Sequence, residues 1–184
     1  DKFYAVDLEN TIHCFSIKSG EAIWKYKTDN FFIKAQKKLS IVINDNILYF
    51  NNSIGDITAI NTEKGGLVWQ YPTQNNQIYG DSFLLKNSDL VINQNSIFFS
   101  NNKNEFYSLN KTNGILNWKQ QINSYLRPIF IENIFITITN EGLFVVGEIE
   151  SGNIIRTNNI FKDLKRKKNE IIKPVQFVSA ANTI

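Results

Sequence analysis

The residues best suited to catalysis are scarce in this 184-residue chain, which has one cysteine, Cys14, and one histidine, His13. A single cysteine excludes an internal disulfide and a cysteine-based metal cluster, and a single histidine excludes a zinc enzyme built on paired imidazoles. A Ser/His/Asp arrangement would have to use His13, whose place on an alternating strand favours a packed or surface residue. The sequence therefore predicts no catalytic residue and no metal site. It also predicts no nucleophile, because Cys14 is expected to be buried and inert.

Acidic residues stand in contexts that are typical of turns. Asp45, Asp56, Asp81 and Asp89 lie among Asn, Gly and Ser residues and are interpreted as turn formers. No calcium loop is present, since that loop alternates Asp and Asn before a Gly and a distal Glu. The nearest string, NNKNE at 101–105, has the spacing of a hairpin turn. We therefore predict no bound cofactor.

Charge and composition exclude several classes of protein. The net charge of +3 comes from residues 162–168, which hold five Lys or Arg and one Asp, so the chain lacks the basic surface of a nucleic-acid binder. That segment is interpreted as a solvated loop or, alternatively, as a docking patch for an acidic partner or anionic lipid head groups. A hydrophobic content of 42% excludes disorder, and no apolar run is long enough for a spanning helix. The absence of Met leads us to expect a processed or excised piece, which could have lost a signal peptide.

A repeat organises the chain. Three tryptophans, spaced 45 and 49 residues apart, each follow a glycine by four residues, and a fourth glycine is followed at that spacing by Arg156. The repeated positions are Gly20 with Trp24, Gly65 with Trp69, Gly114 with Trp118, and Gly152. Six residues before the glycines stand Cys14, Ala59, Ser108 and Val146, and four before them stand Ser16, Asn61, Asn110 and Glu148. Four copies in one register indicate a repeat architecture.

Strand-forming segments surround each copy of the repeat. The second copy contains KLSIVIND, NILYFNNS, GDITAIN and GLVWQYP, which are β-branched or aromatic runs separated by Asn, Asp and Gly. Four antiparallel strands in about 45 residues predict an all-β fold, a β-propeller made of four-stranded blades. The predicted boundaries are blade 1 at about 1–35, blade 2 at 36–82, blade 3 at 83–124, blade 4 at 125–168 and the start of blade 5 at 169–184. We expect each tryptophan to lie flat between adjacent blades.

The eleven residues that begin six positions before each repeated glycine and end four positions after it form a frame. This frame resembles the tryptophan-docking motif of the quinoprotein-like (PQQ-like) propellers. It reads CFSIKSGEAIW (14–24), AINTEKGGLVW (59–69), SLNKTNGILNW (108–118) and VGEIESGNIIR (146–156). The resemblance implies one of two functional classes: quinone-dependent dehydrogenases that hold PQQ and calcium, or non-catalytic scaffolds such as the outer-membrane protein assembly factor BamB. The sequence has neither the adjacent cysteines nor the calcium cluster that the dehydrogenases would require.

The resemblance therefore implies a BamB-like scaffold at the periplasmic face of the outer membrane. Its partners would be β-barrel assembly components or unfolded outer-membrane proteins, with membrane association only through a lipid anchor on the full-length chain and with no nucleic acid. The alternatives are a sensing or adhesion propeller and, third, a fragment of a PQQ-dependent dehydrogenase. Candidate interaction residues are Tyr125 and Arg127, which combine an aromatic and a guanidinium group, and the basic residues Lys165, Arg166, Lys167 and Lys168.

The number of repeats leaves two arrangements open. About four blades are present, whereas related propellers usually have seven or eight, so we expect part of a larger ring. Alternatively, the segment IIKPVQFV (171–178) resembles a first strand and would close a four-bladed ring by completing the first blade, which opens directly at KFYAVDL. An open fragment exposes sheet edges and is expected to dimerise or aggregate.

Overall fold

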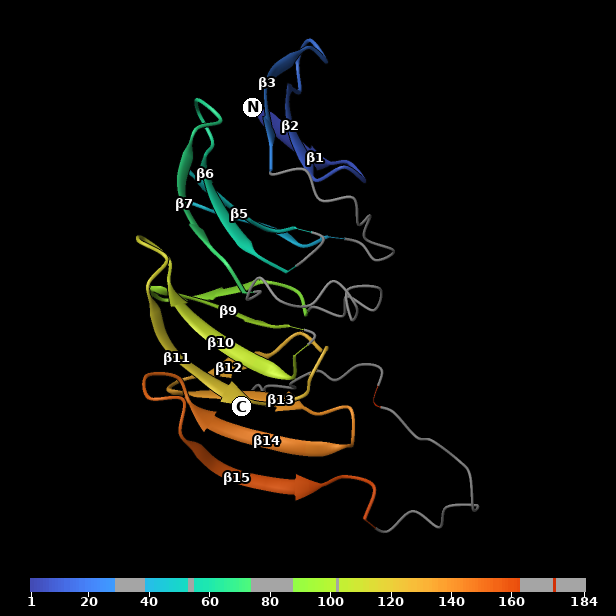
Figure 1. Ribbon diagram of the computed structural model, residues 1–184, viewed down its shortest axis with the longest axis vertical. Helices are drawn as coiled ribbons and strands as arrows, with labels where there is room; N and C mark the ends of the chain where they lie inside the picture. The colour runs from blue at the N-terminus through green and yellow to red at the C-terminus, as the bar shows by residue number, and fades with distance from the viewer. Residues whose placement is uncertain (29–38, 53–54, 74–87, 102, 163–173, 175–184) are drawn as a thin grey trace, which may run out of the picture. The chain divides into compact units, whose positions relative to one another are not determined.

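Short strands that run antiparallel to their sequence neighbours make up the regular structure of the chain (Figure 1). The structure, a computed structural model, describes residues 1–184 except 29–38, 53–54, 74–87, 102, 163–173 and 175–184. The described chain divides into two compact units. Unit 1 comprises Asp1–Lys86 and the turn Lys111–Ile115, and unit 2 comprises Asn87–Asn110 and Leu116–Ile184.

Unit 1 contains two sheets. The first has three strands in the order β1-β2-β3, and the second has four in the order β4-β5-β6-β7. The strands of the first sheet are β1 (Lys2–Val6), β2 (Thr11–Ser16) and β3 (Ala22–Lys27). Those of the second are β4 (Ile41–Asn44), β5 (Ile47–Asn51), β6 (Ile57–Asn61) and β7 (Leu67–Tyr71).

Unit 2 contains two four-stranded sheets with the same meander order. The third sheet is formed by β8 (Val91–Asn93), β9 (Ser96–Ser100), β10 (Glu105–Asn110) and β11 (Leu116–Gln121). The fourth is formed by β12 (Ile129–Ile131), β13 (Ile134–Ile138), β14 (Leu143–Glu148) and β15 (Ile154–Asn159). The antiparallel, four-stranded organisation that the sequence predicts is thus present in three sheets, and the first sheet has one strand fewer.

Each unit has its own core, built from the alternate side chains of two sheets. In unit 1, Ile12 packs with Leu48, Phe50 and Ile60 of the second sheet. In unit 2, the core contains Phe98, Phe106, Trp118, Ile122, Phe135, Val145 and Ile149. Because side chains alternate between the two faces of a strand, one face of each sheet supplies the core of its unit.

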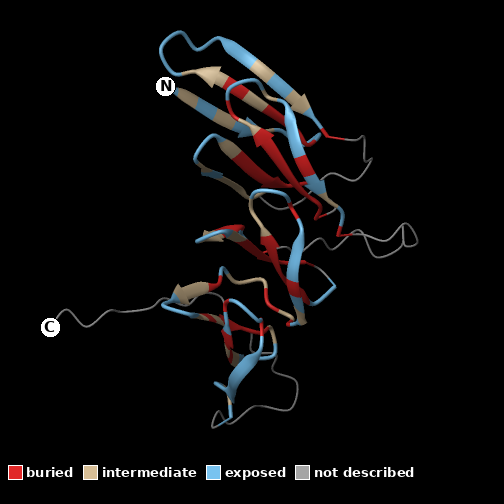
Figure 2. Ribbon diagram, turned by 90° about the vertical axis from the view of Figure 1, so that its left-hand side faces the viewer, coloured by how far each residue is buried: buried red, intermediate tan, exposed pale blue. Residues whose placement is uncertain are grey.

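The last strand of each sheet is the most exposed (Figure 2). In β7 and β11 the tryptophan is buried while both residues before it are exposed, and every residue of β15 is exposed. The chain thus places its repeated tryptophans on otherwise solvent-facing strands. A buried indole on such an exposed strand indicates that the ring packs against another part of the chain.

A predicted fifth blade, at 169–184, lies outside the described residues apart from Pro174. The same is true of the charged segment at 162–168 beyond Lys162. Among the described residues, no helix has the length and apolar character that a membrane span requires.

Candidate functional site

Each tryptophan of the repeat donates a hydrogen bond to the turn of the following copy. The indole Nε1 of Trp24 lies 3.1 Å from the Thr62 carbonyl oxygen, and that of Trp69 lies 3.0 Å from the Lys111 carbonyl oxygen. Trp118 makes the same bond to Ile149, at 2.8 Å. In every case the acceptor stands three residues before the glycine of its copy. The polar edge of each ring is therefore satisfied, while Trp69 and Trp118 are buried and Trp24 is half-buried.

Two separate constraints, the backbone conformation and the close approach of an indole ring, require glycine at these positions of the frame. Gly65, Gly114 and Gly152 have φ between +70° and +74°, where an L side chain is strained. A Cβ on any of the three would also meet the ring of the preceding copy's tryptophan, at 2.5 to 2.6 Å. Each glycine therefore serves as the flat surface on which an indole rests.

Small residues and a bulge make room for the ring on its own sheet. Trp24, Trp69 and Trp118 are paired across the sheet with Cys14, Ala59 and Ser108, all of which are buried. The register then shifts immediately after each of these residues, and the same shift follows Val146 in the fourth sheet. A β-bulge at this point bends the last strand and turns the tryptophan toward the neighbouring copy.

A second recurring element, not predicted from the sequence, closes the hairpin between the middle strands. Asp7, Asn52, Asn101 and Thr139 each stand thirteen residues before a frame glycine. Their side-chain oxygens accept a hydrogen bond from the backbone N–H four residues later, at 2.9 to 3.2 Å. A residue with positive φ follows three positions after each, namely Asn10, Gly55, Asn104 and Gly142. The signal that could have revealed this turn is the Asp/Asn/Thr–Asn/Gly spacing itself.

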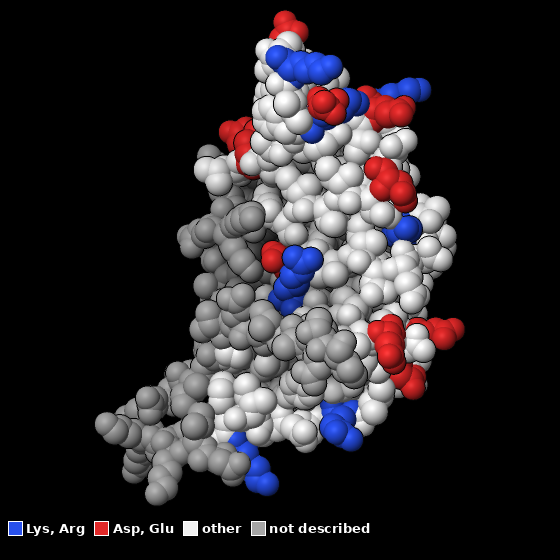
Figure 3. Space-filling view, turned by 180° about the vertical axis from the view of Figure 1, so that it is seen from behind, with Lys and Arg blue, Asp and Glu red and all other residues white. Residues whose placement is uncertain are grey.

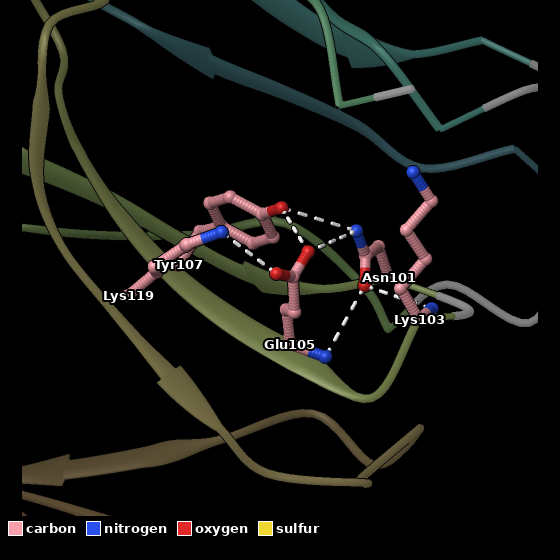
Figure 4. Close-up of polar contacts among 5 residues, drawn as sticks. All are labelled: Asn101, Lys103, Glu105, Tyr107 and Lys119. Carbon is pink, nitrogen blue, oxygen red and sulfur yellow. Dashed lines mark hydrogen bonds and ion pairs between the residues drawn. The ribbon is translucent and has the colours of Figure 1, made fainter. Parts of the chain in front are cut away.

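One of these hairpins carries a buried polar network (Figure 4). The Glu105 carboxylate accepts hydrogen bonds from Lys119 Nζ at 2.8 Å, from Asn101 Nδ2 at 3.3 Å and from the Tyr107 hydroxyl. Burial would raise the pKa of Glu105, but these three donors outweigh it and hold the pKa below its ordinary value. The carboxylate is thus kept ionised by groups of its own sheet, which is typical of a structural ion pair.

The corresponding residue of the second sheet is Asp56, which was predicted to be a turn former. It is buried, and its carboxylate accepts a hydrogen bond from the backbone N–H of Thr73 at 2.7 Å. Its backbone N–H donates to Asn52 Oδ1 in the turn before β6, and its carboxylate also binds the chain that leaves β7, seventeen residues away. Asp45, by contrast, does lie in the β4–β5 turn, with φ of +54°.

The single histidine pairs with an aspartate. His13 Nε2 lies 2.9 Å from Asp7 Oδ2, and the pair is partly exposed. Burial raises and the hydrogen bonds from His13, Thr11 and Glu9 lower the pKa of Asp7, with a net decrease. Cys14 is adjacent to His13 on β2, so its thiol points to the opposite face, where burial raises its pKa. The structure therefore brings together His13 and Asp7 but does not add the cysteine as a nucleophile.

The predicted interaction residues fall into three situations. Tyr125 is half-buried, and burial raises its pKa first of all, with a hydrogen bond from Asn140 opposing and the charge of Glu141 adding to the effect. Arg127, two residues later, is exposed. The structure thus attaches Tyr125 to the β13–β14 hairpin of its own sheet and leaves Arg127 facing solvent. Lys165, Arg166, Lys167 and Lys168 lie outside the described residues.

Charged side chains do not gather by sign on the face that Figure 3 draws. In the view of Figure 3, acidic and basic residues are interspersed among uncharged ones. In the described part of the chain, no three His, Cys, Asp or Glu side chains stand close enough to hold a metal ion.

Exposed apolar side chains recur on the last strands instead. They occupy the two or three positions after the frame glycine: Ile23 on β3, Leu67 and Val68 on β7, Leu116 on β11, and Ile154 and Ile155 on β15. On β7, Leu67 and Val68 are 50% and 46% exposed. Apolar residues on an edge strand, beside backbone groups without a neighbouring strand, can receive another polypeptide.

Comparison with known proteins gives a consistent assignment. Residues 1–158 match the family model described as outer membrane protein assembly factor BamB. No curated protein sequence matches the chain. Among solved structures, BamB from Moraxella catarrhalis superposes with a TM-score of 0.63 and 13% identity, over 85% of this chain and 49% of that one.

Two further structures share the fold. The computationally designed Ika8 protein has a TM-score of 0.67 and 13% identity, over 98% of this chain and 50% of that one. A quinohemoprotein alcohol dehydrogenase from Comamonas testosteroni has a TM-score of 0.66 and 10% identity, over 86% and 33% respectively. The chain thus spans about half the length of the first two. The predicted fold class, blades of a PQQ-type propeller, is confirmed, while the number of blades in the whole ring stays a prediction.

Proposed function

Since the chain belongs to the PQQ-like repeat family described as outer membrane protein assembly factor BamB, we propose that it is a non-catalytic scaffold for protein–protein contacts. The observation that carries the proposal is the match of residues 1–158 to that family. In this role the full-length protein bridges components of a β-barrel assembly complex, or holds unfolded outer-membrane proteins, at the periplasmic face of the outer membrane. It does so by contact rather than by chemistry.

The contact surface we assign to this role consists of exposed apolar side chains on the last strand of a sheet. In the second sheet it consists of Leu67 and Val68, which stand beside Trp69 at the start of β7. The buried indole of Trp69 anchors β7, so the exposed residues of this strand are presented on a rigid element. A rigid apolar anchor loses little conformational entropy when a partner binds, which is the usual property of an interface hot spot.

The test is affinity purification of the full-length protein from its own cell envelope. Recovery of an outer-membrane β-barrel assembly component is expected with the unchanged protein, and recovery should fall at least about tenfold for a Leu67→Asp, Val68→Asp double variant. Gln70→Asp is the matched control, because Gln70 is exposed on the same strand. Failure to recover any assembly component with the full-length protein would overturn the proposal.

The two alternatives predict different results. A PQQ-dependent dehydrogenase would change its absorbance and reduce a dye when PQQ and calcium are added. A sensing or adhesion module would bind peptide or polysaccharide in the absence of any assembly component. Neither response is expected from a scaffold.

A further inference from the structure

The turn between β10 and β11 contains the only Asn-Gly pair in the sequence. Asn113 directly precedes Gly114, whereas Ser19, Lys64 and Ser151 stand at that position in the other copies. In an Asn-Gly pair the glycine nitrogen can attack the side-chain carbonyl carbon of the asparagine, because glycine has no Cβ to crowd the approach. Serine and lysine side chains carry no such carbonyl. The third copy alone therefore places an electrophile beside the backbone nitrogen of its frame glycine.

The folded turn polarises the carbonyl that would be attacked. Asn113 is exposed, and its Oδ1 accepts a hydrogen bond from the backbone N–H of Ile115 at 3.0 Å. Because this bond spans Gly114, it folds the side chain back along the peptide bond that contains the Gly114 nitrogen. Negative charge develops on Oδ1 when the carbonyl is attacked, and the Ile115 N–H then stabilises it as a donor does in an oxyanion hole.

The same hydrogen bond recurs in two other copies, where a hydroxyl accepts it. Ser19 Oγ accepts from the backbone N–H of Glu21 at 3.3 Å, and Ser151 Oγ accepts from that of Asn153 at 3.1 Å. The acceptor thus belongs to the construction of the turn, and this role holds the Asn113 side chain in its place. A serine at this position would keep the hydrogen bond and remove the electrophile.

We propose that Asn113 is a site of spontaneous deamidation. The Gly114 nitrogen forms a bond to Asn113 Cγ, the bond from Cγ to Nδ2 breaks, and ammonia leaves with the proton that the Gly114 nitrogen gives up. The cyclic imide then takes up one water molecule, which opens the ring at either of its two carbonyls. One opening gives aspartate. The other gives isoaspartate, in which the backbone runs through the former side chain.

The two products differ in their effect on Trp69, which this turn supports. Trp69 Nε1 lies 3.0 Å from the Lys111 carbonyl oxygen, and a Cβ on Gly114 would lie 2.6 Å from the indole ring. Isoaspartate lengthens the backbone between these two supports by one methylene, so both cannot keep their places beneath the ring. Aspartate leaves the backbone length unchanged and still accepts from Ile115. Isoaspartate therefore releases Trp69 from its docking position, and aspartate does not.

Peptide mass spectrometry of the purified 184-residue chain, stored in mildly alkaline buffer, tests the reaction. The peptide that contains Asn113 should gain about 1 Da and separate by chromatography into aspartyl and isoaspartyl forms. Asn133 and Asn153, which are exposed and followed by isoleucine, are internal controls. They should react at least about tenfold more slowly, because a β-branched neighbour crowds the attacked region. Equal rates at the three positions would overturn the proposal.

Thermal unfolding tests the consequence for the fold. The melting temperature of the stored chain should fall as the isoaspartyl fraction rises. Asn113→Ser, stored for the same time, should keep both its mass at this peptide and its melting temperature. Asn113→Asp should melt like the freshly prepared chain. A chain rich in isoaspartate with an unchanged melting temperature would overturn the release of Trp69, and so would an equal loss in Asn113→Asp.

Tryptophan fluorescence identifies the ring that is released. Storage should shift the emission to longer wavelength as one indole becomes exposed to water, and the shift should be absent from Trp69→Phe. A shift that persists in Trp69→Phe would place the change elsewhere and contradict the inference. None of these measurements involves an assembly component, so their outcome is independent of the proposed scaffold function.

Discussion

The indole nitrogen of Trp118 lies 2.8 Å from the carbonyl oxygen of Ile149, a residue thirty-one positions later in the chain. The ring that makes this bond rests on Gly152 and lies among Phe98, Phe106 and Phe135. One side chain thus joins the last strand of the third sheet to the turn and core of the fourth. Its packing and its hydrogen bond can be separated by mutation.

Replacing Trp118 should reveal both contributions. Trp118→Phe keeps most of the buried ring but removes the donor to Ile149, so a loss of about 1 to 2 kcal/mol in the free energy of unfolding is expected. Trp118→Ala also leaves a cavity and should cost about 3 to 5 kcal/mol. Urea titration followed by circular dichroism measures the difference. Equal losses for both variants would contradict the separation.

Two glycines with nearly the same φ test the close approach of the indole. Gly65→Ala introduces a Cβ 2.6 Å from the Trp24 ring and adds strain at φ +70°, whereas Gly20→Ala adds only strain at φ +73°. Backbone strain of this kind costs about 1 kcal/mol, so Gly65→Ala should lose several times the stability that Gly20→Ala loses. Thermal unfolding at low protein concentration compares them without interference from association.

The Glu105 network predicts a specific dependence of stability on pH. Because the folded chain lowers the pKa of Glu105, the network stabilises the fold above the unfolded pKa of a glutamate and is lost as the pH falls through the lower, folded value. The stability difference between the unchanged chain and Glu105→Gln should therefore shrink as the pH decreases from about 7 to about 3. Glu63→Gln, at an exposed turn position, is the control and should show no such trend.

Asp7 should tolerate an amide better than an alanine. Its Oδ1 accepts hydrogen bonds from the backbone N–H groups of Glu9 and Thr11, both at 2.9 Å, and Asn at the equivalent positions 52 and 101 accepts the same kind of bond. Asp7→Asn retains these bonds and loses only the ion pair with His13, whereas Asp7→Ala should cost about 1 kcal/mol more. Chemical denaturation of the two variants gives the comparison, and a less stable Asn variant would contradict it.

The features of the fold that could be predicted are those that the repeated sequence pattern indicates. The glycine–tryptophan spacing gave the number of copies, the strand runs gave the antiparallel sheets, and both depend on backbone preferences that act locally. The role of Glu105 could not be predicted in this way, because Lys119 reaches its carboxylate only after β10 and β11 have paired. Asp56 has the local sequence of a turn residue and does close a turn with Asn52, but no local pattern indicates that its carboxylate also accepts a hydrogen bond from Thr73.

The interaction surface was predicted less well for a related reason. Tyr125 and Arg127 were chosen as residue types that often anchor interfaces, but the side chain of Tyr125 is held by Asn140 of its own sheet. The exposed residues Leu67 and Val68 belong to a strand whose sequence alone resembles a buried one. Which side of a strand faces solvent depends on the neighbouring sheet and not on the strand.

The direction of the indole contacts has a consequence for biosynthesis. Every tryptophan rests on the copy that follows it and never on the copy before, so during translation each newly made sheet waits with an uncovered indole until the next repeat has left the ribosome. The growing chain therefore exposes one indole at a time until the fourth copy, which has Arg156 at this position, covers Trp118, and each such ring is a point of contact for chaperones.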